Sequence, residues 1–173
     1  MKHLSLILFF IISLFHSAWA EVRPINEVPM YGGKNISSKS QKTNQKFIDW
    51  AVEEFGNLES ASKDAADRGW RSFYDNDLNT AIKRFNQAWL LNPDNPQSYW
   101  GFGLVMGRRA AQDEPEQHLK ESIHFLQMAT EKAPENGRII GDLAFSNTIL
   151  GHYYKSEKTN IKLATEYFDI AGA

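Results

Sequence analysis

The sequence GWRSFYDNDLNTAIKRFNQAWLLNP, residues 69–93, predicts two helices that fold back on each other. A small residue, Gly69, lies in the first amphipathic segment, and residues 75–77 (Asp-Asn-Asp) interrupt the pattern. The second segment carries Phe85 between two alanines, and Pro93 ends it. Two packed helices need small residues where their backbones approach, a large side chain that fills the groove, and a stop after the second helix. All three features are present here, so this stretch indicates a helical hairpin.

The same pattern returns twice further along the chain. Gly103 follows Gly69 by 34 residues, and Ala144 follows Gly103 by 41 residues. The second segments align as well, with a shared small–large–small spacing. Ala81, Phe85, Ala88 and Pro93 match Ser122, Leu126, Ala129 and Pro134, each 41 residues on, and Ala164, Phe168 and Ala171 continue the series 42 residues later.

A 34-residue helix-turn-helix unit with this spacing and a terminal proline resembles the tetratricopeptide repeat. The resemblance covers residues 62–173, nearly three units, of which the second and third are longer by about seven or eight residues. It implies an all-α fold, a tetratricopeptide-like α-solenoid of about three helix-turn-helix units. In such an array each helix pair buries its apolar face against its neighbours. We therefore predict a helical domain over residues 44–173.

Turn-forming residues divide the later units. Residues 113–115 (Asp-Glu-Pro) predict a turn, with the proline in the first turn of the next helix. Helix-favouring sequence continues to Lys132, and Pro134 stops it. A further helix is expected over residues 139–154, followed by a turn at residues 156–159.

An extra helix is predicted in front of the repeats, over residues 44–57. Phe47, Ala51 and Phe55 recur there at helical spacing, which indicates one apolar stripe that covers the open end of the array. Residues 21–43 carry prolines, glycines and a polar run without sustained periodicity. We predict that they form a flexible linker.

The first 20 residues have the features of an export signal. Lys2 precedes a continuous apolar run over residues 4–15, and Ala18 and Ala20 provide the small side chains that a signal peptidase requires. The run is shorter than the roughly 20 residues needed to span a bilayer. We predict a signal peptide over residues 1–20 that is cleaved after Ala20, and a periplasmic or secreted product without a membrane span. The alternative is an uncleaved N-terminal anchor.

The composition narrows the possible functions. The 173 residues contain no cysteine, which excludes disulfides, thiol chemistry and cysteine-ligated zinc. The absence of disulfides favours a bacterial exported protein. A formal net charge of −2, without a basic stripe, argues against nucleic acid as a partner.

The resemblance also implies a binding surface, because the first helices of tetratricopeptide units line a concave face that holds peptides. The lysine and asparagine that clamp a carboxylate in some relatives are absent, since Ala66 and Trp70 stand at those positions. The other residues expected on this face are mainly aromatic and basic, a combination typical of protein interfaces. The candidate partner-binding residues are Trp70, Phe73, Trp100, Leu104, Arg108, Arg138 and Phe145. Alternatively, these aromatic residues belong to the core, or the helix over residues 44–57 covers them.

The sequence offers little for catalysis or metal binding. Glu121 and His124 form an ExxH pair, but di-iron sites need two copies and two further glutamates. No zinc-helix histidine pair and no nucleophile elbow occurs in the sequence. We therefore expect no cofactor, no metal and no enzyme activity.

Three functions remain open on the sequence alone. The first is a non-enzymatic scaffold or adaptor of the bacterial cell envelope that binds a protein or peptide through the concave aromatic face. The second is a structural protein that self-assembles, for example as a homodimer, through an open C-terminal repeat that exposes Tyr167 and Ile170. The third is an enzyme or an enzyme accessory subunit that uses His118 or His124.

Overall fold

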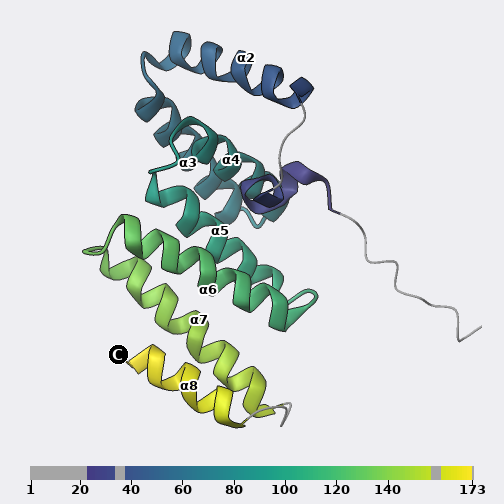
Figure 1. The fold of residues 1–173 in the computed structure, drawn as a ribbon, viewed down its shortest axis with the longest axis vertical. Coiled ribbons are helices and arrows are strands. Elements are labelled where there is room, and N and C mark those ends of the chain that lie inside the picture. Colours follow the sequence, from purple (N-terminus) through teal and green to yellow (C-terminus); the bar gives the residue numbers. More distant parts are fainter. Residues whose placement is uncertain (1–22, 34–37, 157–160, 173) are drawn as a thin grey trace, which may run out of the picture.

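The computed structural model describes residues 23–33, 38–156 and 161–172, and this part of the chain is all-helical (Figure 1). Within these ranges, successive α-helices pack against one another down the long axis of the molecule. The α-helices are α2 (Ser38–Phe55), α3 (Leu58–Tyr74), α4 (Leu78–Leu91), α5 (Pro96–Arg109), α6 (Pro115–Lys132), α7 (Gly137–Ser156) and α8 (Ile161–Gly172), and two short 3-10 turns, η1 (Ile25–Glu27) and η2 (Pro29–Gly33), precede them.

The helix boundaries follow from the capping residues. Asn57, Asp77 and Asn95 each accept a backbone N–H bond at the start of a helix, as an N-cap side chain does. Pro96 and Pro115 occupy the first turns of α5 and α6, where a missing N–H costs nothing. The breaks predicted at residues 75–77, 113–115 and 134 are confirmed. The predicted turn at residues 156–159 lies almost wholly outside the described residues.

Two large side chains fill the spaces between successive helices, at the positions that the sequence pattern predicted. Phe85 of α4 is fully buried, and a Cβ atom added to Gly69 of α3 or Gly101 of α5 would lie 2.7 or 2.4 Å from its ring. Leu126 of α6 is equally buried, and a Cβ atom added to Gly103 of α5 would lie 2.6 Å from its Cγ. These glycines therefore serve close packing. The side chain of Phe168, the third member of the series, lies outside the described residues.

The predicted N-terminal helix exists and is longer than expected. α2 begins at Ser38 and ends at Phe55, whereas the sequence pattern placed it at residues 44–57. Ala51 is buried in a small cluster with alanines of α3 and with Ala88 and Leu91 of α4. α2 thus caps the α3–α4 end of the molecule, at the top of Figure 1.

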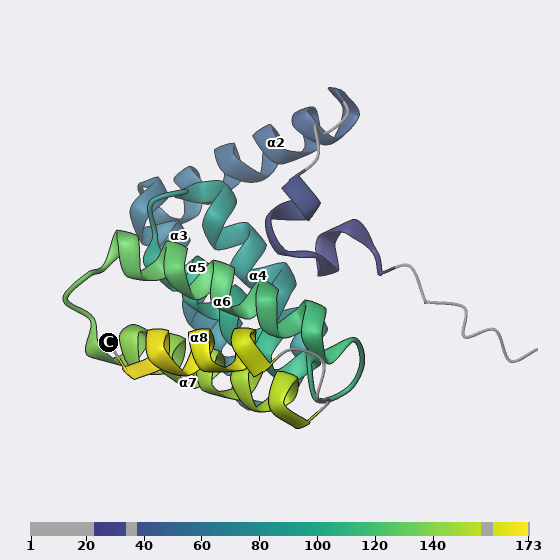
Figure 2. The ribbon, with the colours of Figure 1, turned by 60° about the horizontal axis from the view of Figure 1, so that its bottom comes forward.

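The structure also differs from the sequence prediction in the segment expected to be a flexible linker. Residues 38–43 belong to α2, and residues 23–33 pack beside α4 (Figures 1 and 2). Pro29 is buried, and Met30 contacts the main core. We call residues 23–33 the N-terminal strap. Its short 3-10 turns carry no hydrophobic periodicity, so the sequence pattern could not reveal it.

Two sequence predictions concern the membrane. The signal peptide, residues 1–20, lies outside the described residues. In the part of the chain that is described, none of the helices combines the length and the apolar character that crossing a bilayer requires.

Candidate functional site

The structure brings four of the seven predicted binding residues into direct contact along α3 and α5. The rings of Trp70 and Trp100 lie 4.8 Å apart, and the ring of Phe73 lies 5.9 Å from Trp70. The guanidinium of Arg108 lies 4.4 Å above the Phe73 ring, a cation–π contact. Leu104, the fifth residue, is half-buried and packs against the same core.

The indole nitrogens of the two tryptophans hold this arrangement in place. Trp70 Nε1 donates to Gln97 Oε1 at 2.8 Å, which ties α3 to α5. Trp100 Nε1 donates to Asp142 Oδ2 at 2.7 Å, which ties α5 to α7. Both tryptophans are therefore positioned by partners on the next helix of the series α3, α5, α7. We call the surface carried by these three helices the inner face.

The predicted residues differ in how far they are open to a partner. Phe73 is buried beneath Arg108, so its ring supports the inner face and does not form its surface. Trp70 and Trp100 are half-buried, and Arg108 is exposed and donates to Asn76 Oδ1 at 3.1 Å. Phe145 on α7 is 65% exposed, an unusual degree for a phenylalanine in a folded domain.

The α7 end of the inner face is hollowed. Trp100 and Arg138 line an open depression together with Gln97 and the loop at residues 133–137. Asn136 caps the start of α7 there, because its side chain accepts from the backbone N–H of Arg138 at 3.1 Å. Arg138 itself is exposed. An arginine and an aromatic edge beside a depression match the usual anchors of protein interfaces.

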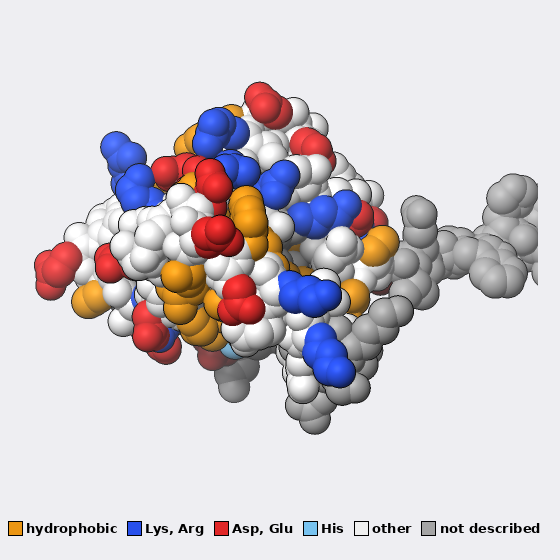
Figure 3. Space-filling view, turned by 90° about the horizontal axis from the view of Figure 1, so that it is seen from above, with side chains coloured by type: hydrophobic (Ala, Val, Ile, Leu, Met, Phe, Trp, Pro, Cys, Tyr) orange, Lys and Arg blue, Asp and Glu red, His pale blue; other side chains and the backbone are white. Residues whose placement is uncertain are grey.

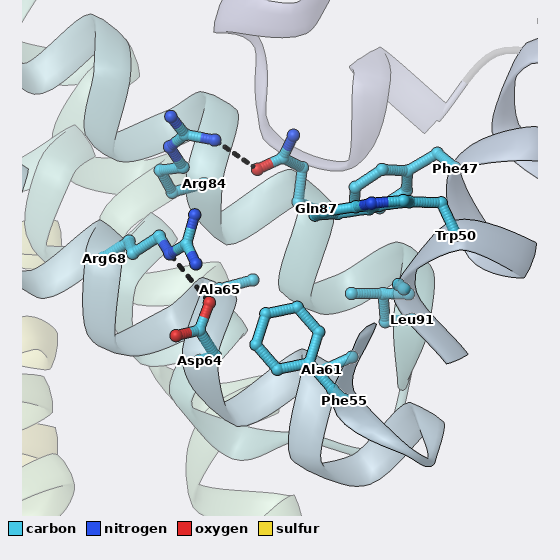
Figure 4. A pocket seen from close by; sticks show the side chains of 11 residues that line it. Phe47, Trp50, Phe55, Ala61, Asp64, Ala65, Arg68, Arg84, Gln87 and Leu91 are labelled. Atoms are coloured by element: carbon cyan, nitrogen blue, oxygen red, sulfur yellow. Dashed lines mark hydrogen bonds and ion pairs between the residues drawn. The ribbon is translucent and has the colours of Figure 1, made fainter. Parts of the chain in front are cut away.

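One alternative left open by the sequence was that the N-terminal helix covers this face. The aromatic side chains of α2 instead contact one another, with Trp50 6.1 Å from Phe55 and 5.9 Å from Phe47. They border a cavity against α3 and α4, shown in Figure 4. The residues described above as contacting Trp70 and Trp100 belong to α3, α5 and α7, whereas α2 packs against α3 and α4.

The cavity beside α2 was not predicted from the sequence. Its volume is about 70 Å³, far below the roughly 300–1,000 Å³ of typical ligand pockets. Arg68 forms an ion pair with Asp64 at 2.7 Å, and Arg84 donates to Gln87 at 3.0 Å, as the dashed lines in Figure 4 show. Each charged side chain at its border thus has a partner among the residues of the lining, and we interpret the cavity as a packing gap under α2.

The two histidines considered for catalysis occupy different environments. His118 is 5% exposed, with Nε2 2.8 Å from Asp113 Oδ1 and Nδ1 3.4 Å from Glu121 Oε2, so a carboxylate faces each ring nitrogen. His124 is exposed and borders a hollow between α6 and the N-terminal strap, with Glu121 nearby. In the described residues, histidines and carboxylates form no cluster of three that could hold a metal ion.

The C-terminal edge is less open than the sequence pattern predicted. Tyr167 is half-buried and stacks on Tyr154, with 5.8 Å between the ring centroids. Ile170 is 48% exposed. Of the two residues that the sequence placed on this edge, Ile170 is therefore the more open to solvent.

The charges on the α2 end of the molecule are mixed in sign. Figure 3 shows lysine and arginine side chains interspersed with aspartate and glutamate, and apolar patches between them. A partner that approaches this end meets no extended field of one sign, and nucleic-acid binding normally depends on such a field.

No protein-family model, curated protein or solved structure matches this chain.

Proposed function

We propose that this chain is a tetratricopeptide-like helical-repeat protein that binds a protein or peptide partner through its inner face. It acts as a scaffold or adaptor and not as an enzyme. Phe145 carries the proposal, because its aromatic ring is 65% exposed, whereas phenylalanine side chains are mostly buried in folded proteins.

Three further observations support this surface. Trp100 and Arg138 border the open depression next to α7, so the aromatic and cationic anchors lie together. The hydrogen bonds of Trp70 and Trp100 fix their rings before a partner arrives, which lowers the entropic cost of binding. Ile149, one helical turn beyond Phe145 on α7, is also exposed and extends the apolar area.

We place this function in the bacterial cell envelope. The support is the sequence of residues 1–20, with its apolar run and small residues before the expected cleavage site, and the lack of cysteine in the full chain. Fusion of residues 1–20 to a reporter that is active only after export tests this placement. A reporter that stays inactive contradicts it.

The binding face can be tested with a pair of matched substitutions on one helix. Phe145→Asp places a charge on the proposed surface, whereas Ile140→Asp makes the same change at another exposed apolar residue of α7. The two positions lie about 140° apart around the helix, given 3.6 residues per turn. Both substitutions are at exposed positions, so we expect each to change stability by about 0.5 kcal/mol or less.

The measurement is quantitative capture of partners from an envelope extract on the immobilised chain. We expect Phe145→Asp, and likewise Arg138→Glu, to lower recovery of the principal partner about tenfold, as loss of an interface anchor does. Ile140→Asp should leave recovery unchanged. Equal recovery with Phe145→Asp and the unsubstituted chain, with circular dichroism unchanged, contradicts the proposed surface.

A further inference from the structure

The N-terminal strap is recognised through its backbone. Buried Asn86 of α4 donates from Nδ2 to the carbonyl oxygens of Asn26 and Val28, at 3.1 and 2.9 Å. Arg109, at the end of α5, donates from Nη1 to the carbonyl oxygen between them, that of Glu27, at 3.0 Å. Three consecutive carbonyl groups are therefore bound by side chains that lie far along the chain.

The two side chains that bind these carbonyls are buried. Arg109 is 1% exposed, and its other contacts are Asn79 Oδ1 at 3.0 Å and the sulfur of Met106. Burial, with a smaller contribution from nearby Arg23, lowers the pKa of Arg109 to about 10, so the side chain stays charged at neutral pH. Asn86 Oδ1 and Arg109 Nε already lack hydrogen-bond partners. The strap carbonyls are the oxygen acceptors that satisfy Asn86 Nδ2 and Arg109 Nη1, and buried donors in folded proteins are normally satisfied in this way.

Ion pairs and an apolar contact complete this site. Glu27 pairs with Lys83 of α4 at 2.8 Å, and Arg23 pairs with Asp113 of the α5–α6 loop at 2.8 Å. Pro29, next to the last bound carbonyl, is buried. The strap thus lies in a binding site formed by α4 and the end of α5, which we call the outer slot. Its charges and donors fit this particular segment.

The strap ends in a strained turn. Met30 and Tyr31 have positive φ angles of 51° and 53°, and Gly32 and Gly33 continue in the same region at 70° and 63°. Side chains with a Cβ atom disfavour this conformation, and two such residues in succession are rare. An extended backbone at residues 30–33 relieves the strain. Strained hinges of this kind favour the exchange of a terminal segment between copies of a protein.

We propose that the outer slot is a segment-binding site that also accepts residues 23–29 from a second copy of this chain, so that two chains exchange their straps. The contacts in the exchanged pair are the same carbonyl bonds and ion pairs as in the single chain. The difference lies in the hinge at residues 30–33, which is folded in the single chain and extended in the pair. The pair therefore forms more readily at high protein concentration.

Cysteine cross-linking between two distinguishable chains tests the proposal. The sequence contains no cysteine, so single introduced thiols react alone. One chain carries Glu27→Cys in the strap, and a second chain with a larger tag carries Lys83→Cys in the slot, two positions that form an ion pair. The chains are mixed in equal amounts, unfolded and refolded together at several concentrations, and treated with a short bis-maleimide.

We expect a cross-link between the two differently sized chains whose yield rises at least severalfold with protein concentration. The matched control places the slot cysteine at Lys63, an exposed lysine of α3 whose ion pair is with Asp67 on its own helix. A chain with both Glu27→Cys and Lys83→Cys should cross-link within itself at low concentration, which verifies the reach of the reagent. An inter-chain yield at position 83 no greater than at position 63 overturns the proposal.

Discussion

At the scale of single residues, the fold depends on large side chains that occupy the space left by glycines. Phe85 meets Gly69 on one side and Gly101 on the other, so one ring joins three successive helices. The alanines of the sequence pattern, Ala81 and Ala88, are fully buried beside it. A glycine inside a helix costs about 1 kcal/mol relative to alanine. The close approach of Phe85 accounts for both glycines.

A double-mutant cycle tests this contact. Phe85→Ala should lower the free energy of unfolding by about 3–5 kcal/mol, the usual cost of truncating a buried phenylalanine. Gly101→Ala should cost about 1–3 kcal/mol, because the new Cβ atom would lie 2.4 Å from three ring atoms. In the double variant Phe85→Leu with Gly101→Ala the smaller side chain relieves that clash. Its loss of stability should therefore be smaller than the sum of the losses of the single variants Phe85→Leu and Gly101→Ala. Urea unfolding measures all variants, and strict additivity contradicts the contact.

A second residue-scale prediction concerns the cap of α4. Hydrogen bonds from the side chain and the backbone of Thr80 lower the pKa of Asp77 below its usual range. Asp77→Ala should therefore cost about 1 kcal/mol at pH 7, as loss of an N-cap does. Because the folded-state pKa is the lower one, this stabilisation is present above the unfolded-state pKa and is lost as the pH falls through the folded-state value.

The cap prediction is measured by urea unfolding at pH 7 and at pH 2.5 to 3. The stability difference between the unsubstituted chain and Asp77→Ala should shrink at the lower pH. Asp77→Asn is the matched control, because an asparagine caps a helix without titrating, and its advantage over alanine should persist at both pH values. A difference that stays constant for aspartate argues against a charged cap.

At the scale of elements, α2 packs less extensively against the rest of the described chain than the other α-helices do. It packs on α3 and the end of α4 through the Ala51 side, while Trp50 and Val52 are largely exposed. The cavity beneath it indicates imperfect packing. α4 and α5, by contrast, contribute many fully buried side chains to the main core. We therefore expect α2 to open locally without unfolding of the other helices.

Hydrogen exchange followed by mass spectrometry checks this expectation. Peptides from α2 should exchange at least tenfold faster than peptides from α4 and α5 under native conditions. Phe47→Ala should speed exchange in α2 further and leave α4 and α5 unchanged, since Phe47 packs against the small cluster around Ala51 and not against the main core cluster. Simultaneous exchange of α2 and α4 contradicts the local opening.

The elements also show which features the sequence could predict. The helix breaks at residues 75–77 and 134 depend on local turn and stop residues, and Phe85 lies in a small–large–small pattern that returns around Leu126, so the sequence pattern located them. The N-terminal strap depends on Asn86 and Arg109, which contact it across 58 to 82 residues of sequence. No local pattern encodes such a contact, and the strap was therefore assigned to a linker.

The predicted binding residues likewise have one property that the sequence could predict, their common face, and one that it could not, their exposure. Trp70, Phe73, Trp100 and Arg108 lie together because spacing along successive helices places them on one face. Their degree of exposure depends on tertiary contacts, and it separates buried Phe73 from exposed Phe145. Spacing can group residues on a face, whereas only packing decides which of them a partner can reach.

At the scale of the whole molecule, the packed helices carry an inner face that is partly open to solvent. The large side chains and glycines hold α3 to α6 in register, and the tryptophan hydrogen bonds extend that register from α3 to α7. The strap closes the side near α4 with backbone contacts. The proposed partner therefore meets a rigid surface, and binding at that surface is the central claim.

The measurement that tests this claim most directly is site-specific photo-crosslinking in the cells that produce the chain. A photoreactive residue replaces Phe145 or Tyr74 on the inner face, and Ile25 or Val52 elsewhere, all four of them exposed positions. Tyr74 ends α3, and its ring lies 6.3 Å from that of Trp70. We predict that both inner-face positions capture one common partner and that the two other positions do not. Capture of that partner from Ile25 or Val52 but from neither inner-face position would contradict the account.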